Sequence, residues 1–242
     1  MEPFGGSASV LIRKPRSYAE VYNDLDSEVV GLFRVLRNPV LAVELQKRIC
    51  LTPFAREEFD EAYEKTNDPV ECARRLIIRA YMGFGSDGHN PENGKTGFRS
   101  NSNRSGTTPA HDWTSYPKQL ARFCERLEGV VIENRDAMEV MEQQDSEECL
   151  HFLDPPYMHD TRGSKHAYRF EMSDEDHAKL LTFVATLKGS VVLCGYQNAL
   201  YDSLGWKSVR RLSMADGARE RVEVLWFNDR AWSAQSQKEM FQ

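Results

Sequence analysis

The feature that most constrains this chain is an Asp-Pro-Pro-Tyr sequence at residues 154–157, which follows a short apolar run. Each proline fixes its own φ near about −65° and keeps the residue before it extended. Neither proline has an N–H group, so this backbone cannot continue as a hydrogen-bonded strand. The sequence therefore predicts a rigid corner at the carboxyl end of a strand, which is where open α/β sheets bind ligands.

This corner carries a defined set of chemical groups. The Asp154 carboxylate and the Pro155 carbonyl are two fixed acceptors, Pro156 stiffens the turn, and Tyr157 places an aromatic ring beside them. Two acceptors and a stacking surface suit a planar amine, so these four residues are the catalytic candidates. The alternative is that the prolines only end a strand and Asp154 caps the next turn. A second stretch, at the start of the chain, favours the catalytic interpretation.

The second stretch, residues 2–11, places paired glycines and small residues before an apolar run. Such a pattern suits a strand-to-helix turn in which the backbone approaches a ligand closely and a helix N-terminus faces it. The cofactor-binding candidates in this turn are Pro3, Phe4, Gly5 and Gly6.

An acidic residue follows at the end of the next predicted strand, over residues 18–22. Asp24 lies about 20 residues beyond the glycines, a spacing typical of an acid that accepts hydrogen bonds from ribose hydroxyls. The other role open to Asp24 is helix N-cap, which Asp26 can equally fill.

Composition limits the possible partners and compartments. A chain of 242 residues with 40% hydrophobic residues can build one α/β domain with an insertion, or two small domains. The net charge of −6 gives no global attraction for a polyanion, so nucleic-acid contacts must be local. Five cysteines without a Cys-x-x-Cys spacing favour a reducing, cytoplasmic compartment. The histidines show no metal-ligand spacing, so we expect them on the surface or in loops and expect no metal. No apolar run approaches the ~20 residues of a membrane span.

Taken together, these motifs resemble the Dam-like (D12 class) DNA adenine-N6 methyltransferases, in the form common in phages and prophages. The likeness begins with the motifs at 2–6, 23–26 and 154–157, and it continues at 130–137, 193–196 and 223–228. It implies a Rossmann-like α/β methyltransferase sheet, mostly parallel, with a C-terminal antiparallel hairpin over the runs 209–212 and 221–227. It also implies a catalytic domain of residues 1–37 and 127–242 and a mainly helical target-recognition insertion at 38–126.

The resemblance implies a reaction as well. S-adenosyl-L-methionine would donate a methyl group to N6 of an adenine flipped out of double-stranded DNA, as in restriction-modification enzymes. Asp154 and Pro155 would accept the N6 protons and Tyr157 would stack on the base. Asp136, followed by Ala137, would lie against the adenine of the methyl donor, and Asp154 would also border the donor site. We expect a monomer or a weak dimer.

Two polar stretches are candidates for DNA contacts. Residues 93–111 contain Lys95, Arg99 and Arg104 and no acidic residue before Asp112. Basic side chains of this kind suit phosphate contacts, and the loop after the corner adds Arg162 and Lys165. Composition alone favours a solvated surface loop for 93–111, whereas the resemblance favours DNA binding.

One departure from the family concerns the start of the chain. Similar enzymes carry a segment with an aromatic residue and Gly-Gly-Lys before the Glu-Pro-Phe-Gly-Gly sequence, where this chain has only Met1. That segment holds the methionine end of the donor, so we expect lower donor affinity and stability. One alternative is therefore an inactive or weakly active DNA-binding remnant. A second, independent of this segment, is an amino-methyltransferase acting on cytosine N4 or RNA.

Overall fold

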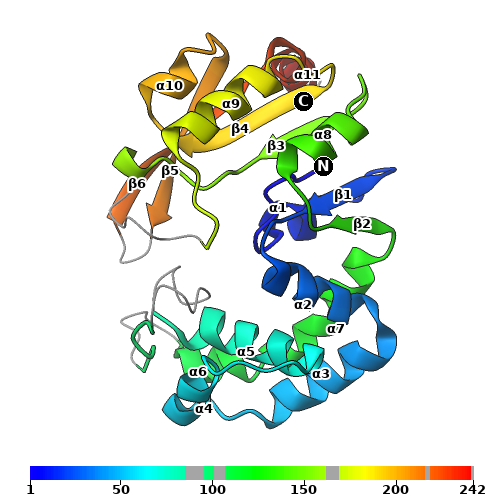
Figure 1. The fold of residues 1–242 in the computed structure, drawn as a ribbon, viewed down its shortest axis with the longest axis vertical. Coiled ribbons are helices and arrows are strands. Elements are labelled where there is room, and N and C mark those ends of the chain that lie inside the picture. Colours follow the sequence, from blue (N-terminus) through cyan, green and yellow to red (C-terminus); the bar gives the residue numbers. More distant parts are fainter. Residues whose placement is uncertain (85–94, 101–106, 162–168, 216–218, 241–242) are drawn as a thin grey trace.

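The computed structural model is a mixed α/β protein with two sheets (Figure 1). It describes residues 1–84, 95–100, 107–161, 169–215 and 219–240. In the first sheet, β1 (Glu20–Asn23) and β2 (Val130–Glu133) run parallel. The second sheet has the order β3-β4-β6-β5. Its strands are β3 (Leu150–Leu153), β4 (Ser190–Tyr196), β5 (Lys207–Ala215) and β6 (Arg219–Phe227).

The second sheet is parallel at one side and antiparallel at the other. β3 and β4 run parallel, while β6 is antiparallel to both β4 and β5. The predicted C-terminal hairpin is therefore confirmed, with longer strands than its apolar runs suggested.

The first two residues join the sheets. The Met1 amine donates to the Leu150 carbonyl at 2.5 Å, and the Phe152 N–H donates to the Met1 carbonyl at 3.0 Å. Glu2 makes the corresponding pair of bonds with β1 and forms a parallel bridge to Tyr22. In a parallel pair, the N–H and the C=O of one residue bond to two different residues of the adjacent strand, as Met1 and Glu2 do here. Residues 1–2 thus lie between β1 and β3, and the parallel strands share one carboxyl edge, which we call the strand rim.

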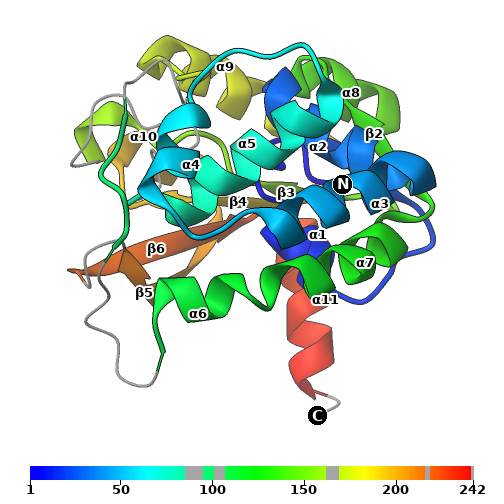
Figure 2. The ribbon, with the colours of Figure 1, turned by 90° about the horizontal axis from the view of Figure 1, so that it is seen from below.

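Helices of the first half form a layer against β1 and β2. They are α1 (Ser9–Arg13), α2 (Ser27–Arg37), α3 (Pro39–Leu51), α4 (Arg56–Glu61), α5 (Pro69–Met82), α6 (Pro109–Trp113) and α7 (Tyr116–Leu127). One hydrophobic cluster contains Tyr22 and Val130 of the strands together with Leu45, Ile78 and Leu120 of the helices. In the view from below, α3–α7 lie in front of the strands (Figure 2).

α2 and α3 are two separate helices, because the chain breaks at Asn38. Pro39 opens α3, and the Asn38 side chain accepts hydrogen bonds from the N–H groups of Val40 and Leu41. An Asn N-cap followed by proline at the first helical position starts a new helix.

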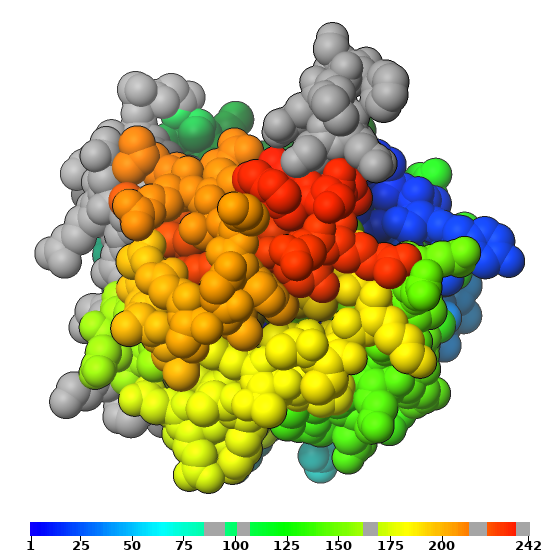
Figure 3. Space-filling model, turned by 90° about the horizontal axis from the view of Figure 1, so that it is seen from above, coloured from blue at the N-terminus to red at the C-terminus, as the bar shows by residue number. Residues whose placement is uncertain are grey.

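Helices of the second half cover both faces of the β3–β6 sheet. α8 (Ala137–Gln144), α9 (Asp174–Val184) and α10 (Ala199–Asp202) pack on one face, and α11 (Asp229–Met240) packs on the other. Seen from above, α9–α11 and the segments around them form the surface (Figure 3). No helix in the described ranges is long and apolar enough to cross a membrane.

Two histidines do not follow the expectation of a surface position. His151 and His177 are both fully buried. The His151 ring lies 3.1 Å from an Asp145 oxygen, and the His177 ring lies 2.9 Å from the Tyr201 hydroxyl. A buried polar ring needs such partners. Asp145 lies six residues before His151 and Tyr201 lies 24 residues after His177, and neither spacing marks the partner in the sequence.

Candidate active site

The Asp-Pro-Pro-Tyr corner leaves β3 directly beside the end of β4. Leu153 of β3 is in register with Leu193 of β4, so the residues that follow, Asp154 and Cys194, are neighbours at the strand rim. The Tyr157 hydroxyl lies 3.4 Å from the Cys194 sulfur. The Tyr157 ring meets the Tyr196 ring edge-on, with centroids 4.6 Å apart and an angle of 72°. The predicted corner is thus braced by β4.

The environment of Asp154 disfavours its charged form. The residue keeps an exposed surface, yet protein atoms surround its carboxyl group closely enough that desolvation raises its pKa. Hydrogen bonds from Tyr157 and Cys194 lower this pKa by less, and the nearby charge of Glu223 on β6 adds to the rise.

Both hydrogen-bonding neighbours of Asp154 hold their protons at neutral pH. Burial is the main cause that raises the pKa of the Cys194 thiol to about 12, and the charge of Asp154 adds to it. Burial likewise raises the pKa of the Tyr157 hydroxyl. The carboxylate is therefore held by neutral donors, which orient it and leave it able to accept a further proton.

The glycine turn predicted from residues 2–11 follows the short strand at residues 1–2. A Cβ at Gly5 would come within 2.1 Å of the Tyr22 ring, so any other residue here would force the ring or the turn to move. Gly6 has φ +48°, in the left-handed region that favours glycine. The Tyr22 hydroxyl donates to the Gly6 carbonyl at 2.6 Å. Phe4 packs against the cluster that contains Leu153, so the turn and the corner border the same core.

Asp24 and Asp26, which sequence reasoning left as alternatives for the helix cap, have separate roles. The Asp26 side chain accepts the Glu28 N–H at 2.9 Å and caps α2. The Asp24 carboxylate accepts the N–H groups of Gly6 and Asp26, each at 2.8 Å. Asp24 therefore ties the glycine turn to the end of β1. Each carboxylate oxygen can accept more than one hydrogen bond, so the predicted ribose contact remains a prediction.

Asp136 is the corresponding acid after β2. Its Oδ1 atom accepts the N–H groups of Met138 at 2.9 Å and Glu139 at 3.2 Å and caps α8. Asp136 is exposed, and Ala137 beside it is buried. The structure thus brings Asp136 to the rim formed by the other motifs, and its predicted contact with the donor remains a prediction.

Asn23 is a residue of the rim that sequence reasoning gave no role. It is fully buried, and its side-chain amide donates to the carbonyls of Pro3 at 2.9 Å and Arg135 at 3.0 Å. Its carbonyl oxygen accepts the Arg135 N–H at 3.0 Å. One amide therefore joins the carboxyl ends of three neighbouring strands. The available signal was an amide residue directly after Val21 and Tyr22 at the end of the strand.

Two of the predicted DNA-binding residues belong to the helical layer. Lys95 forms an ion pair with Asp60 at 2.9 Å and lies over the Tyr63 ring. The Arg99 N–H donates to the Met82 carbonyl at 2.8 Å. Residues 95–100 are thus fixed to α4 and α5, which differs from a freely solvated loop. Arg104, Arg162 and Lys165 lie outside the described residues.

Phe98 anchors this segment. Its ring packs at 5.2 Å from Phe54 and 5.7 Å from Phe59, and the Arg56 guanidinium lies over it at 5.0 Å. Phe98 therefore serves the packing of the helical layer.

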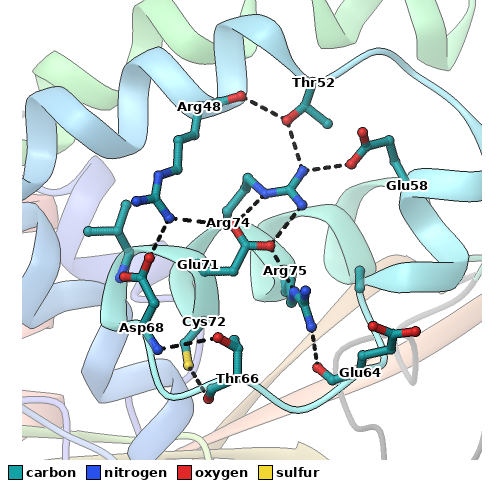
Figure 4. A network of polar contacts seen from close by, with 12 residues as sticks. Arg48, Thr52, Glu58, Glu64, Thr66, Asp68, Glu71, Cys72, Arg74 and Arg75 are labelled. Carbon is teal, nitrogen blue, oxygen red and sulfur yellow. Dashed lines mark hydrogen bonds and ion pairs between the residues drawn. The ribbon is translucent and has the colours of Figure 1, made fainter.

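The arginines of α5 are paired inside the helical layer (Figure 4). Arg74 contacts Glu58 at 2.7 Å and Glu71 at 2.8 Å, and Arg75 contacts Glu71 at 2.8 Å. Arg79 is buried, pairs with Glu28 and donates to the Ala62 carbonyl at 2.6 Å. These cations hold α2, α4 and α5 together.

Within the described part of the chain, no group of three or more His, Cys, Asp or Glu side chains is arranged to hold a metal ion.

Residues 1–214 match the family model described as D12 class N6 adenine-specific DNA methyltransferase. The match spans every predicted site residue. No curated protein matches the chain.

Proposed function

This chain belongs to the D12 class of N6 adenine-specific DNA methyltransferases, and from that premise we propose that it transfers a methyl group from S-adenosyl-L-methionine to N6 of adenine in double-stranded DNA. The observation that carries the proposal is the shared strand rim. Residues 1–2 bond to both β1 and β3, so the glycine turn, Asp24 and Asp154 follow neighbouring parallel strands. We further propose that this sheet is a Rossmann-like methyltransferase sheet.

Several observations at the rim fit the methyl donor. When bound, S-adenosylmethionine supplies an electrophilic methyl group on a positively charged sulfur. Phe4 and Gly5 of the turn are both half-buried, so part of each stays accessible at the rim. Asp24, Asp136 and Asp154 end three strands of the rim and give it negative charge, which favours a cation. These residues would hold the donor.

The role of Asp154 in this proposal is to orient the amine. The Asp154 carboxylate and the Pro155 carbonyl each accept one N6 proton, which directs the nitrogen lone pair at the methyl carbon. As the N–C bond forms and the S–C bond breaks, the nitrogen gains positive charge and then loses a proton to Asp154 or water. Catalysis by orientation suits this arrangement, because no anionic intermediate needs stabilising.

Tyr157 and Pro156 complete the proposed base site. A flipped adenine would stack on the Tyr157 ring, a contact worth about 1–3 kcal/mol in single-strand binders. The contact with Cys194 and the edge-on contact with Tyr196 support a fixed ring.

For DNA binding, we propose that residues 38–126 form the target-recognition insertion between the catalytic segments 1–37 and 127–242. Helices of this insertion share a hydrophobic cluster with β1 and β2, which would hold it at a constant position relative to the rim. Because Lys95 is paired with Asp60, we expect Arg99, Arg104, Arg162 and Lys165 to contribute more to phosphate binding than Lys95.

The proposal is tested by incubating the purified chain with labelled S-adenosylmethionine and adenine-containing duplex DNA, followed by mass spectrometry of the nucleosides. We expect N6-methyladenine, and we expect Asp24→Ala to raise the KM for the donor more than it lowers kcat. Methylcytosine as the product would contradict the proposal and support methylation of cytosine N4. Methylation of RNA alone would contradict it and support an RNA amino-methyltransferase. Absence of donor binding by calorimetry would favour the DNA-binding remnant.

A further inference from the structure

Asp154 lacks the backbone donor that usually orients an aspartate in a turn. An Asp side chain commonly accepts a hydrogen bond from the N–H two residues further on. At this corner that residue is Pro156, and proline has no N–H. The position of the carboxylate therefore depends on donors from other side chains.

Cys194 is one of these donors and comes from a different strand. It is 6% exposed at the end of β4, and the register of Leu153 with Leu193 brings it beside Asp154. The register sets the Cys194 side chain beside that of Asp154, and the Cys194 sulfur lies 3.4 Å from the Tyr157 hydroxyl. Asp154, Tyr157 and Cys194 are thus close neighbours at the strand rim.

We propose that Cys194 is a positioning residue, whose S–H group holds the Asp154 carboxylate in the orientation that accepts an amine proton. This inference rests on the proposed methyltransferase function and assigns Cys194 no contact with substrate. The strand position of Cys194 is set by its neighbours on β3 and β6, so it provides a rigid support for a corner that has no backbone donor of its own.

A thiol suits this role because it stays neutral. Burial keeps the Cys194 proton in place at neutral pH, so the group donates and does not add a second negative charge. The other titratable groups that act on Asp154 and Cys194 are Tyr157 at the corner, Glu223 on β6 and Tyr201 on α10. Glu223 disfavours the charged form of Asp154. None of these three groups is a cation, so none of them can stabilise the Asp154 charge in place of a lost Cys194 donor.

The test compares Cys194→Ala, which removes the donor, with Cys194→Ser, which keeps one. The pKa of Asp154 is measured by ¹³C NMR of aspartate carboxyl groups in the full chain, with the signal assigned through Asp154→Asn. We expect Cys194→Ala to raise this pKa by about one unit, the size of one weak donor to a carboxylate, and Cys194→Ser to restore most of the shift. Cys124→Ala, at a half-buried thiol of α7, is the matched control and should leave the pKa unchanged.

Kinetics give a second measurement. In single-turnover methylation, the acid limb of the rate against pH should move upward by the same amount in Cys194→Ala, while the donor KM stays constant. An unchanged Asp154 pKa in Cys194→Ala, or equal shifts in the Ala and Ser variants, would overturn the inference. If the wild-type chain transfers no methyl group to DNA, the proposed function fails, and the NMR titration still decides whether Cys194 positions Asp154.

Discussion

The helical layer and the strand rim both contain acidic side chains, but their surroundings differ. In the helical layer, Glu71 lies against Arg74 and Arg75, and hydrogen bonds from these arginines lower its pKa although burial acts in the opposite direction. At the rim, burial raises the pKa of Asp154, and its hydrogen-bonding partners Tyr157 and Cys194 are neutral. Charge pairing in the first region stabilises the fold. In the second, an acid held by neutral groups remains able to accept a proton.

The comparison also extends to the base of β1. Glu20 is buried, and Arg126 of α7 donates to its two carboxylate oxygens at 2.7 and 2.9 Å. Lys14 binds the same carboxylate. Glu20 and Asp154 therefore belong to opposite ends of the sheet with opposite electrostatic surroundings.

The largest effect is expected at the rim. Asp154→Ala should lower methyl transfer by about 10²- to 10⁴-fold, since it removes the group that orients the amine and takes its proton. The free energy of unfolding at neutral pH should stay constant or rise, because the folded protein disfavours the charged carboxylate. Single-turnover kinetics and urea denaturation measure the two quantities.

The exposed Asp160, on the 3₁₀ turn His159–Thr161, provides the control. Asp160→Ala should leave both quantities unchanged. Full activity of Asp154→Ala would contradict the assignment of the rim as the reaction site.

A second prediction concerns the pH dependence of stability. Burial alone would raise the pKa of Glu20, but hydrogen bonds from Arg126, Lys14 and the Ser17 N–H outweigh it and lower the pKa to about 2. The ionised carboxylate therefore stabilises the folded state above the ordinary value of 4.5, and this contribution is lost as pH falls toward about 2. Glu20→Gln should cost about 3 kcal/mol at pH 7 and flatten the acid limb of the stability curve.

Urea denaturation at several pH values measures this curve. The control is Glu175→Gln, at an exposed acid on α9. Asp154 should show the opposite sign, since an acid with a raised pKa destabilises the fold as pH rises through its titration. Parallel pH curves for Glu20→Gln and the wild type would remove the contrast between the two regions.

Removing Arg74 should act on stability and spare the chemistry. Arg74→Ala leaves Glu58 and Glu71 with fewer partners in a partly buried network (Figure 4). We expect a loss of about 2 kcal/mol in the free energy of unfolding, with methyl transfer per folded molecule unchanged. Lys179→Ala, which breaks an exposed pair with Glu175, should leave the free energy of unfolding nearly unchanged. A rate defect in folded Arg74→Ala would mean that this network also serves DNA binding.

The last prediction concerns a steric contact at the glycine turn. Gly5→Ala would place a methyl group against the Tyr22 ring and should lower stability by about 1–3 kcal/mol. It should also weaken donor binding, because the turn must move. Gly31→Ala is the matched control, since nothing lies within 4 Å of a Cβ there and the position is helical. It should raise stability by about 0.5–1 kcal/mol. Calorimetry with the donor and thermal unfolding compare the pair, and equal behaviour of the two variants would contradict a tight turn at Gly5.

The family and the local elements of the site follow from short-range rules. Proline geometry predicts the corner after β3, and glycine geometry predicts the turn at Gly5 and Gly6, because both depend on the backbone of a few consecutive residues. The capping box that begins α9, between Ser173 and Asp176, is likewise built from four consecutive residues. The family match bears out the motif order that these local elements carry.

Other features were decided only in three dimensions. The sequence could not assign the cap of α2 to Asp26 and the glycine turn to Asp24, since both acids have the same chemistry and nearly the same position. It also could not show that Lys95 is paired with Asp60 or that Asn23 joins three strand ends. Asp24 bonds Gly6, 18 residues away, and Asn23 bonds Arg135, 112 residues away.

The sequence by itself therefore determined which chemical groups this protein presents and the local backbone that carries them. The tertiary structure decided which acids are neutralised by arginine and which, like Asp154, are held by a tyrosine and a thiol. The physical reason is that backbone geometry is a property of neighbouring residues, whereas solvation and charge pairing depend on every group that the fold brings within a few ångströms.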